Sequence, residues 1–232
     1  MELTPEISTA SILLTGFVLG LQHARDADHL AAVSTIVSEK KNLFTASLVG
    51  GLWGIGHTIS LFAVALIVIL LKLQIPESVG DWLEAVVGAM LILLGLNALR
   101  KFFNAEKVHI HSHEHGQREH IHIHIHESEK QESHHALSPR SVIIGMVHGL
   151  AGSAGLMLLV VPTIASPVTA LIYILVFGLG SVAGMMAMSF FIGLPLYLTS
   201  SRFTFVNSGI RLVAGLFSLG LGAVIIYEKL LA

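Results

Sequence analysis

The sequence predicts an all-α integral membrane protein with six transmembrane helices. Of its 232 residues, 53% are hydrophobic and only 12% are charged, and the mean hydropathy is +0.78. A soluble domain carries about 25% charged residues. Long apolar runs recur along the chain, and a helix needs roughly 20 such residues to cross a bilayer. The six runs cover residues 9–37, 44–72, 80–103, 140–162, 167–193 and 205–230.

Composition also limits the chemistry that is available. The net charge of -2 gives no sign of nucleic-acid binding, and the absence of cysteine excludes disulfides and thiolate metal sites. A metal ion must therefore be held by histidine, aspartate, glutamate or backbone oxygen. Residues 1–6 lack the basic region of a signal peptide, so we expect the first apolar run to be retained.

The first run contains a polar stretch, residues 23–29, which reads His-Ala-Arg-Asp-Ala-Asp-His. Ionisable groups at membrane depth cost several kcal/mol each unless they are paired or wetted, so they indicate a functional site. Imidazole and carboxylate together suit a divalent ion of the nickel, cobalt, zinc or iron kind. The alternative is a short cytoplasmic loop, but the apolar halves on either side are each shorter than the ~20 residues of a span.

Helix geometry restricts how this stretch binds an ion. On a regular helix Asp28 lies roughly 140° around the axis from His23. A single regular helix therefore cannot direct His23, Asp28 and His29 to one ion. Either the helix unwinds here, as in many transporters, or some of these residues orient the ligands and do not bind. We expect Arg25 to balance the charge of one aspartate when no metal is bound.

Two further histidines, His57 and His148, lie in the second and fourth runs. A lone membrane histidine often serves as a hydrogen-bonding residue between helices, but four of them together favour one shared site. The candidate metal-site residues are His23, Asp26, Asp28, His29, His57 and His148. Weaker candidates, which equally suit interhelical hydrogen bonding, are Ser34, Thr58, Asn97, Ser153 and Ser181.

A faint internal repeat relates the two halves of the chain. Gly20 and His23 match Gly145 and His148, and three spans per unit force the second copy to enter the membrane from the opposite side. Glycine-rich membrane sequences produce such matches by chance, but the register of the two histidines favours two inverted three-helix repeats. The other matches are Gly54 and Gly56 with Gly178 and Gly180, and Gly88 and Gly95 with Gly215 and Gly222.

The chain divides into residues 1–103 with helices 1–3, a histidine-rich linker at 104–139, and residues 140–232 with helices 4–6. Ten of the 14 histidines lie in the linker, a composition typical of metal binding. Their irregular spacing predicts a fluctuating chelator without fixed geometry, although an extended Ile-His run places alternate histidines on one face. The alternative is a merely solvated linker. The candidate linker ligands are His109, His111, His113, His115, His120, His122, His124 and His126.

Lysine and arginine predict the orientation. Nine of them follow runs 1, 3 and 5, against two on the opposite side. Positive residues favour the cytoplasmic side. We therefore expect a multi-pass protein of the cytoplasmic membrane with both termini outside and the linker in the cytoplasm.

At its polar residues the chain resembles the nickel/cobalt transporter (NiCoT/NicO) superfamily, and more closely its compact six-helix branch of urease-accessory nickel transporters and nickel/cobalt efflux proteins. The family signature His-x4-Asp-His is present as His23, Asp28 and His29, and the second-helix pattern as residues 55–58, Ile-Gly-His-Thr. The resemblance implies transport of Ni2+ or Co2+ with these residues and His57 as binding residues. The acidic Asp-Thr motifs that larger members carry in later helices are absent.

Secondary transport is the favoured function: the ion sheds water at the intramembrane site, and one repeat rocks against the other. We expect membrane lipid, the metal ion and cytoplasmic metallochaperones as partners, and no permanently bound cofactor. A membrane di-iron enzyme would need regular histidine boxes on several helices, and the His-Glu-x-x-His motif of a zinc protease is absent. A metal-storage protein would leave the polar first run unexplained.

Overall fold

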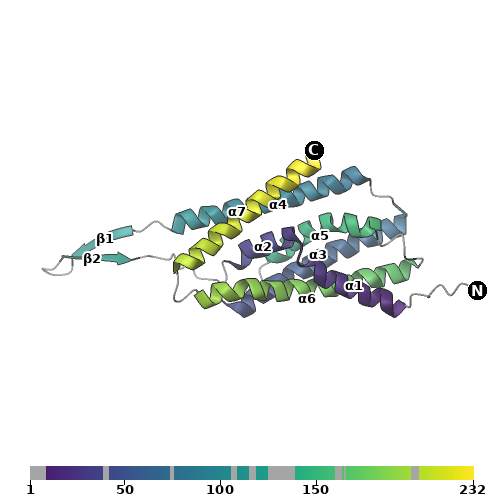
Figure 1. Ribbon diagram of the computed structural model, residues 1–232, viewed down its shortest axis with the longest axis horizontal. Helices are drawn as coiled ribbons and strands as arrows, with labels where there is room; N and C mark the ends of the chain where they lie inside the picture. The colour runs from purple at the N-terminus through teal and green to yellow at the C-terminus, as the bar shows by residue number, and fades with distance from the viewer. Residues whose placement is uncertain are drawn as a thin grey trace, which may run out of the picture.

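The computed structural model describes residues 9–38, 42–73, 76–105, 109–114, 119–124, 139–159, 164, 166–199 and 204–232. These residues form seven helices and one two-stranded antiparallel sheet (Figure 1). The elements are α1 (Thr9–His23), α2 (Ala27–Val37), α3 (Leu43–Leu71), α4 (Glu77–Ala105), β1 (His109–Glu114), β2 (Glu119–His124), α5 (Pro139–Leu159), α6 (Pro167–Thr199) and α7 (Thr204–Leu230).

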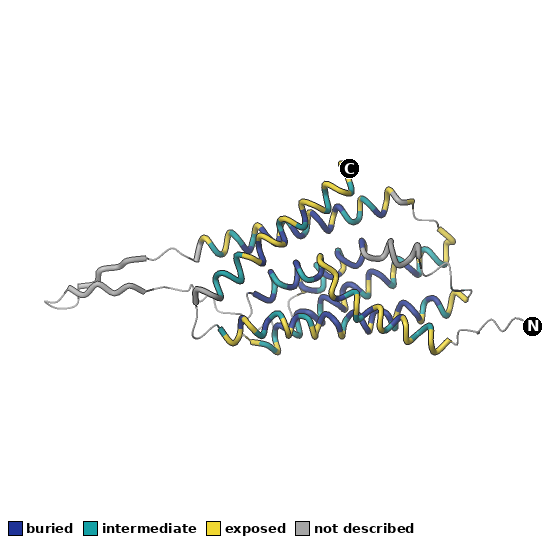
Figure 2. The backbone as a smooth tube through the Cα atoms, in the orientation of Figure 1, coloured by how far each residue is buried: buried dark blue, intermediate teal, exposed yellow. Residues whose placement is uncertain are grey.

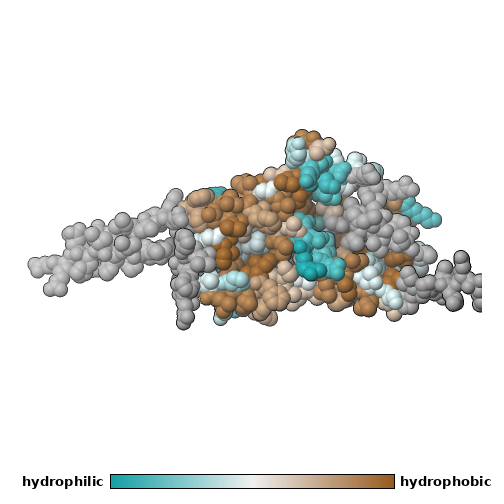
Figure 3. Space-filling model, in the orientation of Figure 1, coloured by the Kyte–Doolittle hydropathy of each residue, from teal (hydrophilic) through white to brown (hydrophobic). Residues whose placement is uncertain are grey.

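Four helices are long and apolar enough to cross a membrane. They are Leu43–Leu71, Ser78–Phe103, Pro167–Thr199 and Asn207–Leu230, within α3, α4, α6 and α7. Helices suit this environment because all backbone polar groups are satisfied within the segment. Large apolar side chains such as Leu93, Phe191 and Leu198 are exposed on the outside, and most of the helical surface in Figure 3 is apolar. The predicted helical membrane protein is confirmed at this level.

The first apolar run differs from the single helix expected over residues 9–37. It forms two shorter apolar helices, α1 and α2, separated by residues 24–26. The break coincides with the polar stretch. Across it the side chain of His23 contacts that of Asp26, a contact discussed below. In Figure 1 the break lies near the middle of the long axis of the bundle.

The helices pack in pairs around the centre of the molecule. α3 lies against both α5 and α6, α1 lies along α6, and α4 lies along α7. α2 leaves the α1–α6 pair and packs among α4, α6 and α7. Buried positions concentrate on the inward sides of these helices, as the dark segments of Figure 2 show. The break between α1 and α2 is therefore surrounded by helices from both halves of the chain.

The linker contains a hairpin where the sequence predicts a fluctuating tract. β1 and β2 pair antiparallel from His109 with His124 to Glu114 with Glu119. Alternating isoleucine and histidine explains this pairing, since β-branched residues fit a pleated strand. Of the linker ligands predicted above, His115 and His126 lie outside the described residues.

Candidate metal centre

The break between α1 and α2 brings the polar stretch together. α1 ends at His23, and two turn hydrogen bonds follow it, from Arg25 N to Gln22 O at 2.9 Å and from Asp26 N to His23 O at 3.1 Å. Asp26 then takes an extended backbone conformation (φ -61°, ψ 148°) and α2 starts at the next residue. The helix therefore unwinds, as one of the two sequence-based alternatives expected.

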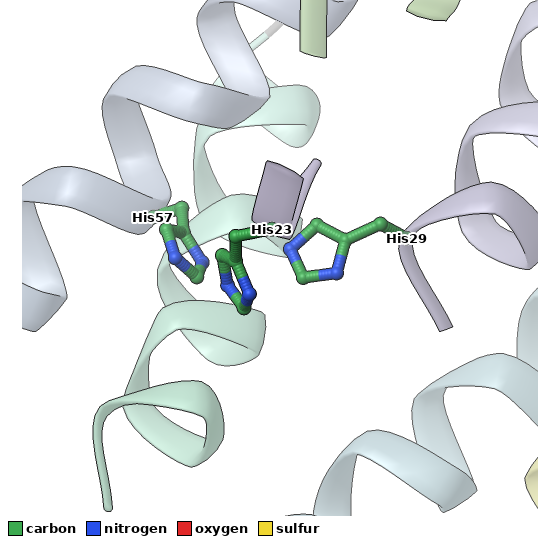
Figure 4. Close-up of side chains that lie close together, drawn as sticks. All are labelled: His23, His29 and His57. Atoms are coloured by element: carbon green, nitrogen blue, oxygen red, sulfur yellow. The ribbon is translucent and has the colours of Figure 1, made fainter. Parts of the chain in front are cut away.

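Three imidazoles meet at this break. Ring nitrogens of His23, His29 and His57 all lie within 4.8 Å of one another. The ring centroid of His23 is 4.5 Å from that of His29 and 5.2 Å from that of His57. Figure 4 shows the His23 ring between the other two. α1, α2 and α3 thus each supply one histidine to the cluster.

Two carboxylates orient these rings. His23 Nδ1 lies 2.7 Å from Asp26 Oδ2, and His29 Nδ1 lies 3.0 Å from Asp28 Oδ1. An ionised carboxylate only accepts hydrogen bonds, so each Nδ1 carries the hydrogen and each Nε2 keeps a lone pair. The Nε2 atoms of both histidines and both ring nitrogens of His57 are buried without a partner among the described residues. Because a neutral imidazole has one nitrogen with a free lone pair, these four unpartnered nitrogens give the cluster three possible metal-ligand atoms, one from each histidine.

His148 of α5 joins the same cluster through Asp28. Its Nε2 lies 3.0 Å from Asp28 Oδ2 and 3.2 Å from His29 Nδ1. Asp28 Oδ1 also accepts from the backbone N–H of His29 at 2.9 Å. Both oxygens of Asp28 are thus occupied by histidine donors. All six candidate residues of the membrane region lie in one connected group, with His29 shared between its two halves.

Aromatic side chains that the sequence analysis missed enclose the rings. Trp53 stacks on His29 with centroids 5.6 Å apart and meets His148 edge-on at 5.4 Å. Phe177 of α6 lies 5.4 Å from His23. The available signal was the position of Trp53 one helical turn before His57, on the same face of α3.

Access to the cluster is graded. The side chain of Asp26 is 54% exposed and that of His23 16%, whereas His29, His57 and His148 are almost fully buried. The face in Figure 3 carries a hydrophilic patch near its middle, amid apolar surface. Arg25 is also exposed and forms no ion pair among the described residues. Histidines contact both carboxylates, and the balance of an aspartate by Arg25 stays a prediction.

Comparison with known proteins identifies the family. The family model NicO, described as high-affinity nickel-transport protein, matches residues 9–155. The chain belongs to the NicO family. It is thus a member of a transporter family and not an enzyme.

Relatives cover most of the chain. It is 36% identical to the urease accessory protein UreH of Bacillus sp. (strain TB-90), over 89% of this chain and 87% of that protein. It is 26% identical to the chloroplast protein FOR GROWTH AND FERTILITY 2 of Arabidopsis thaliana, over 93% of this chain and 56% of that protein. The chain thus spans a little over half of the Arabidopsis protein. No solved structure matches the chain.

The weaker polar candidates of this NicO protein have mixed roles. Thr58 donates to Gly54 O at 2.8 Å and to Gly178 O of α6 at 3.3 Å, and Ser34 donates to Ala31 O at 2.8 Å. The bond from Thr58 to Gly178 joins α3 to α6 and matches the interhelical alternative, whereas the bond of Ser34 stays within α2. Ser181 differs, because its hydroxyl is buried without a partner among the described residues. The side chain of Ser153 lies outside the described part of the chain.

The donor set suits a divalent transition metal. His23 and His29 each direct Nδ1 to a carboxylate, an arrangement found around ligated metals that raises the basicity of the free ring nitrogen. Metal–nitrogen bonds of about 2.0–2.1 Å place tetrahedral ligand nitrogens roughly 3.4 Å apart. Because the nitrogens of His23, His29 and His57 lie within 4.8 Å of one another, they would need to approach by at most about 1.4 Å to bind one ion in this geometry.

Proposed function

We propose that this NicO protein carries Ni2+, and Co2+ as a second substrate, across the cytoplasmic membrane through the intramembrane histidine cluster. The observation that carries the proposal is the convergence of the unpartnered nitrogens of His23, His29 and His57 at a helix break. A buried polar group without a partner costs about 1–3 kcal/mol. A transported cation offsets that cost at all three positions when it occupies the cluster.

In this proposal the six residues divide their roles. His23, His29 and His57 bind the ion. Asp26 and Asp28 orient the rings of His23 and His29 and supply negative charge that offsets the cost of removing water from the ion. His148 binds Asp28 and fixes it from the second half of the chain. The exposed side of Asp26 receives the ion, and His23 passes it inward to the buried histidines. These roles extend the family resemblance to particular atoms.

We further propose six spans, the first of them broken into α1 and α2. α5 has 21 residues, and a rise of 1.5 Å per residue gives it a length of about 30 Å, the thickness of the hydrocarbon core. α1 and α2 cross together, with the break near the middle. Discontinuous helices of this kind form the midplane binding sites of many secondary transporters.

Helix crossings support two inverted repeats, because they occur in equivalent pairs. A Cβ on Gly20 would collide with the carbonyl of Phe177, and one on Gly145 would collide with the carbonyl of Trp53. In the sequence match, residues 20–23 correspond to 145–148 and residues 54–57 correspond to 178–181. Gly20 therefore corresponds to Gly145, and Phe177, next to the second match, corresponds to Trp53, so that the two crossings are equivalent. Two further crossings are equivalent in the same way: a Cβ on Gly180 would collide with the carbonyl of Phe17, and one on Gly56 with the carbonyl of Val142.

The aromatic contacts obey the same equivalence. Phe177 lies 5.4 Å from His23, and its counterpart Trp53 lies 5.4 Å from His148, the counterpart of His23. The ligands themselves are asymmetric, since His57 corresponds to Ser181 and Asp28 has no acidic counterpart. We infer that the two units rock about one off-centre site, which exposes it to each side of the membrane in turn.

The orientation with both termini outside and the linker in the cytoplasm rests on the lysine and arginine asymmetry. Ser128→Cys and Glu2→Cys test it, because the native chain contains no cysteine. An impermeant thiol reagent on intact cells should label the variant at position 2 and spare the one at position 128. The reverse pattern contradicts the orientation and the expected access of metallochaperones to the linker.

Transport is tested in liposomes that contain the purified protein and an internal Ni2+-sensitive dye. We expect Ni2+ flux with the native protein and little with His57→Ala. Ile59→Ala is the matched control, because Ile59 is on the same helix and exposed on its outer side. Repeating the assay with Co2+ tests the second substrate. Equal flux with and without His57 would exclude the proposed site.

A further inference from the structure

The outer surface at the break between α1 and α2 is polar near the middle of the bundle. Gln22, Arg25 and Asp26 are exposed there, and the side chain of Asp26 is 54% exposed. The hydrophilic patch near the middle of Figure 3 lies where Figure 1 draws the break. Ionisable groups at membrane depth face protein or water and not lipid. If α1 and α2 cross the membrane together, as proposed above, this surface of a single copy needs a cover.

Polar side chains also lead along α1 to the break. Ser11, Thr15 and Gln22 recur at helical spacing on one exposed stripe, with Val18 among them. Among the described helices α1 packs closely only along α6, so this stripe faces away from the bundle. Exposed positions of α4 are apolar by contrast, as at Leu93, which is 68% exposed. Hydroxyl and amide side chains join helices within membranes, and the stripe therefore has the composition of a helix–helix interface.

The two charges at the break are not used up within one copy. Arg25 forms no ion pair among the described residues. Asp26 contacts His23 Nδ1 through Oδ2 at 2.7 Å, and its Oδ1 makes no hydrogen bond to any residue that the structure describes. The surface thus presents an unpaired cation beside a carboxylate with a free oxygen. A surface of this kind is complementary to a copy of itself.

We propose that a second copy of this chain covers the break, so that Arg25 of each copy binds Asp26 of the other. Such a contact is isologous, because the same surface of both copies meets across a two-fold axis. Two copies inserted in the same orientation have that axis along the membrane normal, and their equivalent residues lie at the same depth. A polar break at mid-depth therefore meets the polar break of the second copy.

The second copy also completes the entrance to the intramembrane cluster, a step that rests on the proposed function. Asp26 is the exposed residue at which the ion arrives, and it orients His23. Without metal, the guanidinium of Arg25 from the second copy neutralises this carboxylate, which it can bind through two parallel hydrogen bonds. An arriving divalent ion displaces it. The counter-charge expected from Arg25 thus acts between copies and not within one.

Complementary charge variants test the pairing. Arg25→Asp gives two acidic residues at the break and Asp26→Arg gives two basic ones, so identical copies of either variant repel one another. We expect each variant alone to self-associate at least roughly tenfold more weakly than the native chain, as light scattering in detergent measures. Expressed together with different affinity tags, the two variants should co-purify as a mixed dimer, because opposite charges meet again. Lys72→Asp is the matched control, since it makes the same charge change at an exposed position of α3 and should leave the native dimer intact.

Cysteine cross-linking tests the contact in the otherwise native chain, which contains no cysteine. A short bifunctional thiol reagent should join two copies of Gln22→Cys in membranes, without metal, into a product of twice the mass. Leu93→Cys is the control, because its thiol lies on the exposed apolar side of α4 and should give no such product. A monofunctional reagent with the same reactive group measures how completely each thiol reacts.

Absence of the cross-link at position 22 would overturn the proposal, and so would a dimer that persists in both charge variants alone. A cross-link from position 22 to a protein of another mass would assign the surface to a different partner and overturn it as well. These results are distinct from failure of the proposed function. Ni2+ flux with His57→Ala reports on the cluster, and thiol labelling at positions 2 and 128 reports on the crossing of α1 and α2. Labelling of both positions from the same side would remove the membrane placement on which the pairing rests.

Discussion

His148 Nε2 lies 3.0 Å from the carboxylate of Asp28, although the two residues belong to opposite halves of the chain. The contact links α5 to the first turn of α2, where the proposed ligand His29 lies. One residue of the second half thereby holds the acidic group of the first. We propose on this ground that His148 positions Asp28, although His148 also belongs, with Asp28 and His29, to a group whose atoms lie within 4.8 Å of one another.

His148→Ala should weaken Ni2+ binding and transport while the protein stays folded, because Asp28 loses one of its donors and His29 becomes less well oriented. Loss of a group that orients a metal ligand costs roughly 10- to 100-fold in affinity or activity. His148→Gln provides the matched control, since its amide can still donate to Asp28. We expect partial recovery of Ni2+ affinity with glutamine. A full loss with glutamine as well would favour direct ligation by His148.

Asp28→Asn should reduce Ni2+ flux about 10- to 100-fold. The amide keeps the size of the side chain but removes the charge and one acceptor oxygen, so one of the two histidines loses its partner. The control is Asp81→Asn, which makes the same change at an ion pair with Lys229 far from the histidines in sequence. Flux in liposomes, normalised to the amount of inserted protein, should separate the two variants. Unchanged flux in Asp28→Asn would mean that the polar stretch is only structural.

The sequence predicts the general architecture of this site well and its atomic roles poorly. Four histidines within apolar runs are conspicuous because charge and polarity are costly in a bilayer, and all four meet in the structure. The division between ligands and orienting carboxylates could not be predicted, because it depends on how α1 stops after His23. Trp53 also escaped notice, because its one signal, a position one helical turn before His57, does not by itself distinguish a site residue from a core residue.

The linker shows the opposite case. Its composition predicts metal binding, but spacing along the chain does not reveal which histidines become neighbours. That depends on the hairpin register, which pairs His109 with His124 and His111 with His122. A shift of the register by one residue would pair each histidine position with a position that is not a histidine.

Gly20→Ala and Gly145→Ala should destabilise the protein to similar extents. At each position a Cβ would collide with a backbone carbonyl, that of Phe177 or Trp53, which cannot move as a side chain could. Overpacking of this kind costs typically about 1–3 kcal/mol. Gly220→Ala in α7 is the control, because a Cβ there meets nothing within 4 Å. Thermal unfolding in detergent should show lower midpoints for the first two variants only. A low midpoint for one of them alone would weaken the proposed equivalence of the two halves.

Deletion of residues 109–126 should separate the two histidine populations. The intramembrane cluster is held by helices, so transport at saturating metal and the preference between Ni2+ and Co2+ should stay largely unchanged. The number of ions bound at equilibrium should fall, and the lost ions should follow the general affinity order, with Cu2+ above Ni2+ and Co2+. Binding by the linker should also weaken as the pH falls below about 6.5, the reference pKa of imidazole, because a protonated ring has no lone pair for the metal. The test compares bound-ion stoichiometry at pH 7.5 and pH 5.5, and initial Ni2+ flux, in the native chain and the deletion variant. Loss of flux at saturating Ni2+ would show that the linker belongs to the permeation path.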